Sequence, residues 1–183
     1  MESEEKKDRN AEALRSGLIL GLFSIVMTVL IYIISATLLG DWKTGLGIAA
    51  ISIFLVAYFG RKYRNEENDG FMSFKESFLY SYVVLFVSSI VSAAFLILLY
   101  EVIDPELPKI LSDQAIENTE KMMRNFGAPE EAIEEALEKV ENEMPANFSA
   151  IGIMKNSWVY FITSAVFALI ASLFIKKSKP EFE

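Results

Sequence analysis

The sequence contains no cysteine and no histidine. The chain therefore has no disulfide, no thiol nucleophile and no thiolate metal ligand, and it lacks the side chain that most often binds metals and moves protons near neutral pH. Its long apolar runs carry no ionisable residue at their centres, where ion pumps, proton relays and intramembrane proteases need one. The net charge of -8 provides no general basic surface for nucleic acid. We expect no catalytic residues, no cofactor, no metal site and no nucleic-acid partner.

What the sequence does contain is four apolar runs. Of its 183 residues, 52% are hydrophobic, and they are concentrated in blocks instead of being spread as the core of a soluble domain requires. Such blocks predict an all-α fold, an integral membrane four-helix bundle with an extramembrane amphipathic helical hairpin between the third and fourth spans. The expected spans are residues 17–39, 43–60, 76–100 and 151–175, with the hairpin at 101–150 and polar tails at 1–16 and 176–183.

The runs differ in length. Residues 17–39 are 23 uncharged residues, which at about 1.5 Å per residue cross a hydrocarbon core of about 30 Å. The second run has only 16 uncharged residues, 45–60, so it crosses only if Trp42 and Lys43 reach the interface or the bilayer thins locally. Ser73 and Glu76 form a capping-box pattern, which predicts the start of the third helix.

Most of the charge asymmetry lies between the third and fourth runs. Residues 101–145 contain 13 acidic and 4 basic residues, a net charge of -9. Pro105 predicts a break after the third span. Gly127 is placed as the C-cap of a first amphipathic helix and Pro129 as the first residue of a second one, which Pro145 ends. The two helices predict an αα-hairpin.

One face of this hairpin is apolar and the other is acidic. We interpret the apolar face as packed against the hairpin's other helix. Because methionine and aromatic side chains adapt to varied partners, a candidate surface for docking another protein is the functional alternative. The glutamates run parallel on a straight helix, whereas calcium needs about 6 to 8 converging oxygens, so we expect a solvated face. The candidate interaction surface consists of Met122, Met123, Phe126, Ile133, Leu137, Val140 and Met144.

Small residues recur at four-residue intervals in the first and fourth runs. Such spacing lets membrane helices approach closely, so we interpret these positions as helix-packing seams in preference to nucleophiles. The seams join helices of one chain or of two chains, and we prefer one chain because four spans already supply mutual partners. The helix-packing candidates are Gly17, Gly21, Ser81, Ser88, Ser92, Ser164, Ala168 and Ser172.

Basic residues flank the apolar runs. The membrane anchors that we expect are Arg61, Lys62 and Arg64 after the second run and Lys176 and Lys177 after the fourth. If both termini are inside, 11 Lys and Arg residues fall inside and 6 outside. By the positive-inside rule, this predicts a multi-pass protein of the inner (cytoplasmic) membrane with N- and C-termini cytoplasmic and the hairpin outside.

Several short motifs resemble those of a known family. They are D-G-F-M-S-F at residues 69–74, D-P at 104–105 and G-A-P-E-E-A-I-E at 127–134, together with the glycine-rich first run and the basic exit from the second. In this order they resemble a bacterial four-helix inner-membrane family known as a domain of unknown function, DUF4199. The resemblance covers nearly the whole chain and implies a bacterial membrane protein. It brings no activity, cofactor or catalytic residue.

These observations favour a non-enzymatic integral membrane protein, an accessory, assembly or interaction subunit. Its expected partners are the lipid bilayer and a membrane protein or a second copy of the chain. The first alternative is a small transporter or channel with a path lined by Ser, Thr and Tyr. The second is a membrane enzyme that uses the extracytoplasmic carboxylates, which a converging pair of acids with raised pKa values in a cleft would reveal.

Overall fold

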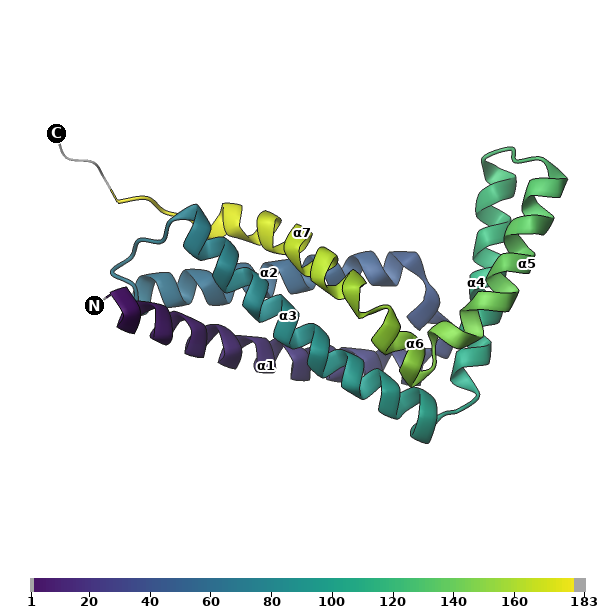
Figure 1. Cartoon of the computed structure of the whole chain (residues 1–183), viewed down its shortest axis with the longest axis horizontal. Helices are drawn as coiled ribbons and strands as arrows, with labels where there is room; N and C mark the ends of the chain where they lie inside the picture. The colour runs from purple at the N-terminus through teal and green to yellow at the C-terminus, as the bar shows by residue number, and fades with distance from the viewer. Residues whose placement is uncertain (1, 180–183) are drawn as a thin grey trace. The chain divides into compact units, whose positions relative to one another are not determined.

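The computed structural model describes residues 2–179, and the regular elements of this part of the chain are helical (Figure 1). One isolated antiparallel bridge, between Met72 and Lys177, adds a β-type pairing. In chain order the elements are α1 (Glu2–Ile34), the 3-10 helix η1 (Ala36–Gly40), α2 (Trp42–Glu66), α3 (Phe74–Leu98), the π-helical turn η2 (Leu99–Ile103), α4 (Leu107–Asn125), α5 (Glu130–Asn147), α6 (Ala150–Lys155) and α7 (Ser157–Ile175).

Four helical segments are long and apolar enough to cross a membrane. They are Arg9–Ile34, Trp42–Glu66, Phe74–Ile103 and Ser157–Ile175, with 26, 25, 30 and 19 residues. At about 1.5 Å per residue the shortest is about 28 Å long, close to a hydrocarbon thickness of about 30 Å. The expected all-α fold, with four spans and a helical hairpin between the third and fourth, is confirmed, and the chain is a multi-pass membrane protein.

The first helix starts earlier and ends earlier than the apolar run that predicted it. α1 takes in the polar residues from Glu2 onward, but it ends at Ile34, before the expected end of the span at residue 39. Ser35 has an extended backbone, and its hydroxyl lies 2.9 Å from the hydroxyl of Thr37. Because short hydroxyl side chains that bond locally compete with helical hydrogen bonds, the chain leaves the α-helix here. Residues 36–40 continue as the 3-10 helix.

The second and third helices follow their local signals. α2 reaches 25 residues because it begins at Trp42, before the uncharged run, and continues past the run to Glu66. The backbone N–H and the hydroxyl of Ser73 donate to Glu76 Oε2 at 2.8 and 2.7 Å, and the Glu76 N–H donates to the Ser73 hydroxyl at 3.3 Å. This reciprocal pairing confirms the predicted capping box at the start of α3.

The helices of the hairpin differ from expectation at two prolines. Pro129 is the N-cap of α5, with an extended backbone, so Glu130 is the first helical residue instead of Pro129. The expected end of α5 at Pro145 is wrong, since the helix continues to Asn147. Pro145 lacks the N–H that would bond to the residue four positions earlier, but Ala146 and Asn147 keep theirs, and the helix ends two residues after the proline.

The fourth apolar run, residues 151–175, is divided into two helices. Ser149 caps α6 by accepting a hydrogen bond from the Gly152 N–H, and α6 ends at Lys155. The side chain of Asn156 then donates to the side-chain oxygen of Asn147 at 3.0 Å. The span itself is therefore the 19-residue α7.

The chain folds into two compact units, each made of segments that are distant in sequence. The first, which we name the bundle unit, consists of Leu46–Ser92 with the described residues up to Val26 and from Trp158 onward. The second, the hairpin unit, consists of Met27–Gly45 and Ala93–Ser157.

The bundle unit is built around buried small and apolar side chains from α1, α2, α3 and α7. Leu20, Val56 and Ala168 are buried in this core. Tyr80 stacks on Tyr63 with 5.4 Å between ring centroids, and its hydroxyl lies 2.9 Å from that of Ser16. Many large apolar side chains on the outside of these helices remain exposed, as lipid-facing positions do in a bilayer.

The hairpin unit places α4 and α5 side by side and antiparallel (Figure 1). At the turn between them Gly127 has a φ of +71°, which glycine adopts without the steric cost of a Cβ. The Ala128 N–H donates to the carbonyl of Met123 at 3.0 Å, closing the last turn of α4 in the manner of a glycine C-cap. The predicted role of Gly127 is confirmed.

The base of the hairpin is held by contacts within the same unit. The Tyr32 hydroxyl donates to Asp104 Oδ2 at 2.8 Å. The Ala150 N–H donates to Glu101 Oε1 at 3.0 Å. These bonds connect the end of α1 and the start of α6 to η2 and to Asp104, the residue that follows it.

Candidate functional site

Two arginines near the end of α2 bind the last turn of α7. Arg61 Nε donates to the carbonyl of Phe174 at 2.8 Å, and Arg64 Nη1 donates to the carbonyl of Ile175 at 2.5 Å. The last turn of α7 has no basic residue of its own. The arginines therefore satisfy carbonyls that lack a partner inside the helix and place positive charge at the negative end of its dipole.

The two lysines after α7 lie at the same end of the bundle unit. Lys177 pairs with Met72 through two backbone hydrogen bonds of 2.9 and 2.8 Å, which tie the residues after α7 to the α2–α3 connection. The ammonium groups of Lys176 and Lys177 lie 6.0 and 5.3 Å from the ring centroids of Phe74 and Phe71. The expected anchor residues thus come from two distant segments but gather at one end of the unit.

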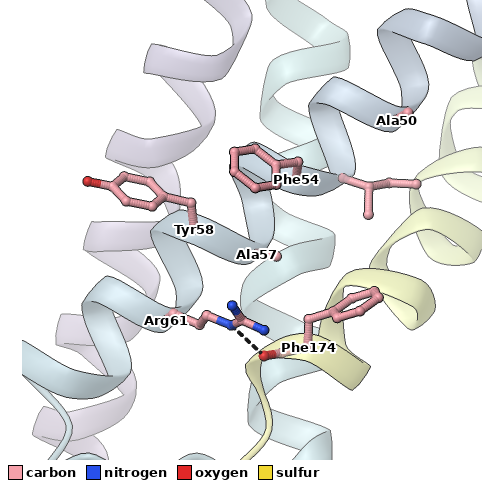
Figure 2. Close-up of a pocket in the computed structure, with 7 residues that line it drawn as sticks. Ala50, Phe54, Ala57, Tyr58, Arg61 and Phe174 are labelled. Carbon is pink, nitrogen blue, oxygen red and sulfur yellow. Dashed lines mark hydrogen bonds between the residues drawn. The ribbon is translucent and has the colours of Figure 1, made fainter.

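A groove of about 310 Å³ lies on the bundle unit beside these arginines. It has an apolar lining that ends at the guanidinium group of Arg61 (Figure 2). Sequence reasoning did not single it out. Its residues on α2 recur at three- and four-residue spacing, which could have indicated one shared helix face. No local pattern indicates that Phe174 of α7 completes it.

The expected helix-packing residues lie at contacts inside the bundle unit. A Cβ built on Gly17 would lie 2.8 Å from the Cβ of Val87, and one built on Gly21 would lie 2.7 Å from the Cβ of Val91. α3 of the same chain therefore fills the glycine seam of α1. Ser81, Ser88, Ser164, Ala168 and Ser172 are buried, and Ser92 is half-buried.

The expected interaction surface of the hairpin separates into a covered part and an exposed part. Ile133 is 2% exposed. Leu137, Val140, Met144 and Met123 are half-buried. Met122 and Phe126, at the end of α4, are 55% and 84% exposed. The stripe on α5 is therefore largely used in holding the hairpin together, and the most exposed members of the expected surface, Met122 and Phe126, lie at the tip.

The tip of the hairpin is held by an arginine that joins both helices. Arg124 on α4 donates to both carboxylate oxygens of Glu130 on α5, at 3.0 and 2.7 Å, and also to Glu120 at 3.0 Å. These hydrogen bonds and the positive charge hold the pKa of Glu130 below its ordinary value of 4.5. The carboxylates in turn raise the pKa of Arg124.

The other acidic residues of α5 face solvent. Glu131, Glu134, Glu135, Glu138, Glu141 and Glu143 are all exposed. Among the side chains that the structure describes, no three acidic groups are gathered in a way that could hold a metal ion. The glutamate face of α5 therefore produces a negative electrostatic potential at the surface of the hairpin.

Comparison with known proteins gives a family and no activity. A family model described as "Protein of unknown function (DUF4199)" matches residues 15–177, from within α1 to the end of the lysine pair after α7. No curated protein and no solved structure matches the chain.

Proposed function

The chain belongs to the DUF4199 family of proteins of unknown function, and we propose that it is a non-enzymatic accessory, assembly or interaction subunit of a bacterial inner membrane. Its hairpin unit binds a partner outside the cytoplasm. The partner is a membrane protein or a second copy of this chain.

The topology that we propose places residues 1–16 and 176–183 in the cytoplasm and residues 101–150 outside it. The excess of Lys and Arg on the proposed inner side, 11 against 6, supports this orientation. The gathering of Arg61, Arg64 and the lysine pair at one end of the bundle unit supports it as well. A reporter enzyme fused after Lys179 should be active in its cytoplasmic form; activity confined to a reporter that works only outside would contradict the orientation.

The exposed tip of the hairpin is the observation that carries the proposal. Phe126 is 84% exposed next to a turn that the Arg124–Glu130 pair holds in place. Complete burial of a phenylalanine side chain is worth about 1.5 to 3 kcal/mol, which a partner with an apolar pocket would gain. A side chain presented on a fixed turn also loses little conformational freedom on binding.

The charge of the hairpin indicates the chemistry of the partner. The exposed glutamates of α5 give the hairpin a negative charge that begins next to the tip. A partner with an apolar pocket and a basic rim would be attracted before contact, and its association rate would fall as salt is raised. An acidic hairpin is at the same time repelled by anionic lipid headgroups, which keeps the tip available to protein.

Site-specific photo-crosslinking in native membranes tests this proposal. A photoreactive residue placed at position 126 should give a discrete protein adduct, and one placed at 138, on the glutamate face, should give less of it. Lys121→Gln is a suitable companion substitution, since it changes the charge of the hairpin without touching the tip residues Phe126 and Met122. Adduct yield at 126 should fall in high salt.

Two results would count against the accessory role. The first is the absence of any protein adduct at 122 and 126, including one with a second copy of the chain, in a variant whose hairpin is folded. The second is solute flux through the purified chain in reconstituted vesicles, which the transporter alternative predicts.

A further inference from the structure

The groove on the bundle unit has the shape and lining of a site for a single chain-like apolar molecule. Ala57 in its floor is buried, whereas Phe54, Tyr58 and Phe174 are exposed and stand along its sides (Figure 2). Because α2 and α7 both cross the membrane, this surface faces the acyl chains of the bilayer. The complete lining is Ala50, Ile53, Phe54, Ala57, Tyr58, Arg61 and Phe174.

The length of the groove matches one leaflet. Its first lining residue on α2 is Ala50 and its last is Arg61, eleven positions later. At about 1.5 Å per residue this distance is about 16.5 Å, slightly more than half of a hydrocarbon core of about 30 Å. A lipid whose headgroup lies at Arg61 would therefore have its acyl chain along the apolar part of the groove.

Arg61 provides a headgroup contact at the interface end. Its Nε donates to the carbonyl of Phe174 at 2.8 Å, which holds the guanidinium plane in place (Figure 2). None of the residues that the structure describes accepts a hydrogen bond from either terminal nitrogen of Arg61. Two adjacent N–H donors on a fixed guanidinium match two oxygens of a phosphate group.

The charge around Arg61 selects among lipids. Arg64, Lys176 and Lys177 lie at the same end of the unit, so the local field is positive. A phosphodiester without a compensating cation gains from this field, whereas the choline group of phosphatidylcholine would be repelled by it. A free phosphate ion would leave the apolar part of the groove unused.

We propose that this groove is a binding site for one anionic phospholipid, one of whose two acyl chains lies along the groove and whose phosphate binds the terminal nitrogens of Arg61. The lipid comes from the leaflet on the side where both chain termini emerge. The site is independent of the hairpin, so the result of its test does not depend on whether the hairpin binds a protein.

Native mass spectrometry after reconstitution tests the site. The full chain is placed in vesicles of equal parts phosphatidylglycerol and phosphatidylcholine, extracted gently and examined for retained lipid. The unsubstituted chain should keep one phosphatidylglycerol. Arg61→Gln should lose this adduct, whereas Lys62→Gln removes the same charge from the neighbouring position outside the groove and should keep it.

A second variant separates the groove from the structural bond of Arg61. Ala50 is exposed at the far end, so Ala50→Leu fills the acyl position without touching the Arg61–Phe174 contact. It should reduce retention of phosphatidylglycerol at least about tenfold, as an occupied pocket excludes its ligand. Ala94→Leu, at an exposed position of α3, is the matched control and should retain the lipid.

Three outcomes would overturn the proposal. One is equal retention of phosphatidylglycerol and phosphatidylcholine by the unsubstituted chain. Another is unchanged retention in both Arg61→Gln and Ala50→Leu. The third is a loss in Lys62→Gln as large as that in Arg61→Gln, which would indicate attraction to the basic end of the unit without a defined site.

Discussion

Gly17 of α1 lies against Val87 of α3 so closely that a Cβ on the glycine would come within 2.8 Å of the valine Cβ and 2.9 Å of the Val84 carbonyl oxygen. Real Cβ atoms do not approach other heavy atoms that closely. Both obstructing atoms are on or next to the backbone of α3, so they cannot move aside as the end of a flexible side chain could. The absence of a side chain at Gly17 is what allows the two helices to pack.

Gly17→Ala should therefore destabilise the bundle unit. Alanine favours a helix over glycine by up to about 1 kcal/mol, but overpacking of a tight contact costs about 1 to 3 kcal/mol, so the net change is a loss. Gly47→Ala is the matched control, because nothing lies within 4 Å of a Cβ at that position of α2. Reversible unfolding in mixed micelles should show a lower unfolding free energy for the first variant and an equal or higher one for the second.

The same contact predicts that Gly17 and Gly21 join two helices of one chain and do not set the size of an oligomer. Gly17→Leu combined with Gly21→Leu should disturb packing against Val87 and Val91 of the same chain. The oligomeric mass measured by light scattering in detergent should stay unchanged, in contrast to the thermal stability, which should fall. A smaller oligomer from a folded double variant would show that the seam joins two chains.

Arg64→Ala should loosen the end of α7. The Arg64 side chain is half-buried and donates a charge-assisted hydrogen bond to the Ile175 carbonyl, an interaction worth about 1.5 to 3 kcal/mol before solvent screening reduces it. Amide hydrogen exchange in the last turn of α7 should become faster. Lys62→Ala, two positions earlier and exposed, should leave that exchange unchanged. Equal effects of the two substitutions would mean that general charge, and not the bond to α7, matters.

Ile133→Ala and Phe126→Ala should affect different properties of the hairpin: the first its stability, the second its binding of a partner. Ile133 is almost completely buried, so its truncation leaves a cavity and should lower the stability of the hairpin by about 2 to 4 kcal/mol. Phe126 is exposed, so its truncation should change stability by less than about 0.5 kcal/mol while reducing partner crosslinking at the tip. Circular dichroism with crosslinking yield checks both. A folded Phe126→Ala variant that crosslinks normally from position 122 would exclude the aromatic ring as the anchor.

The hairpin tip should respond to acid through Glu130. Because Arg124 holds the pKa of Glu130 below 4.5 in the folded chain, the ionised carboxylate stabilises the turn above that value. The stabilisation is lost as the pH falls through the lower folded pKa. Exchange protection at Gly127 and Ala128, corrected for intrinsic rates, should therefore decrease on acidification below 4.5.

Substitution of neighbouring glutamates identifies the group responsible. Glu130→Gln should lower protection at neutral pH and remove its acid dependence. Glu131→Gln, at the next exposed position, should retain both. A persistent acid response in Glu130→Gln would assign the effect to another carboxyl, such as Glu120, which also binds Arg124.

Local signals in the sequence predicted much of the secondary structure. The Ser73–Glu76 pair marks a helix start because its three hydrogen bonds form within one turn. Gly127 marks the end of α4 because the turn that closes the helix requires a positive φ at this one position, and glycine adopts it without a steric cost. Ser35 shows where such signals were insufficient: the apolar run continues through it, but its local hydroxyl contact with Thr37 accompanies a break in the α-helix. Hydropathy measures the preference for lipid and does not determine backbone geometry.

The sequence by itself determined that this chain crosses a membrane with four helices and carries an acidic helical hairpin, because both properties follow from composition and periodicity along short segments. Tertiary structure decided what covers each apolar face. It placed Val87 in the seam of Gly17, hid Ile133 within the hairpin while leaving Phe126 exposed, and brought Arg61 to the end of α7 to form one end of a groove. A periodic pattern shows which side of a helix is apolar, but the atoms that meet that side come from distant segments, and only the folded arrangement of those segments identifies them.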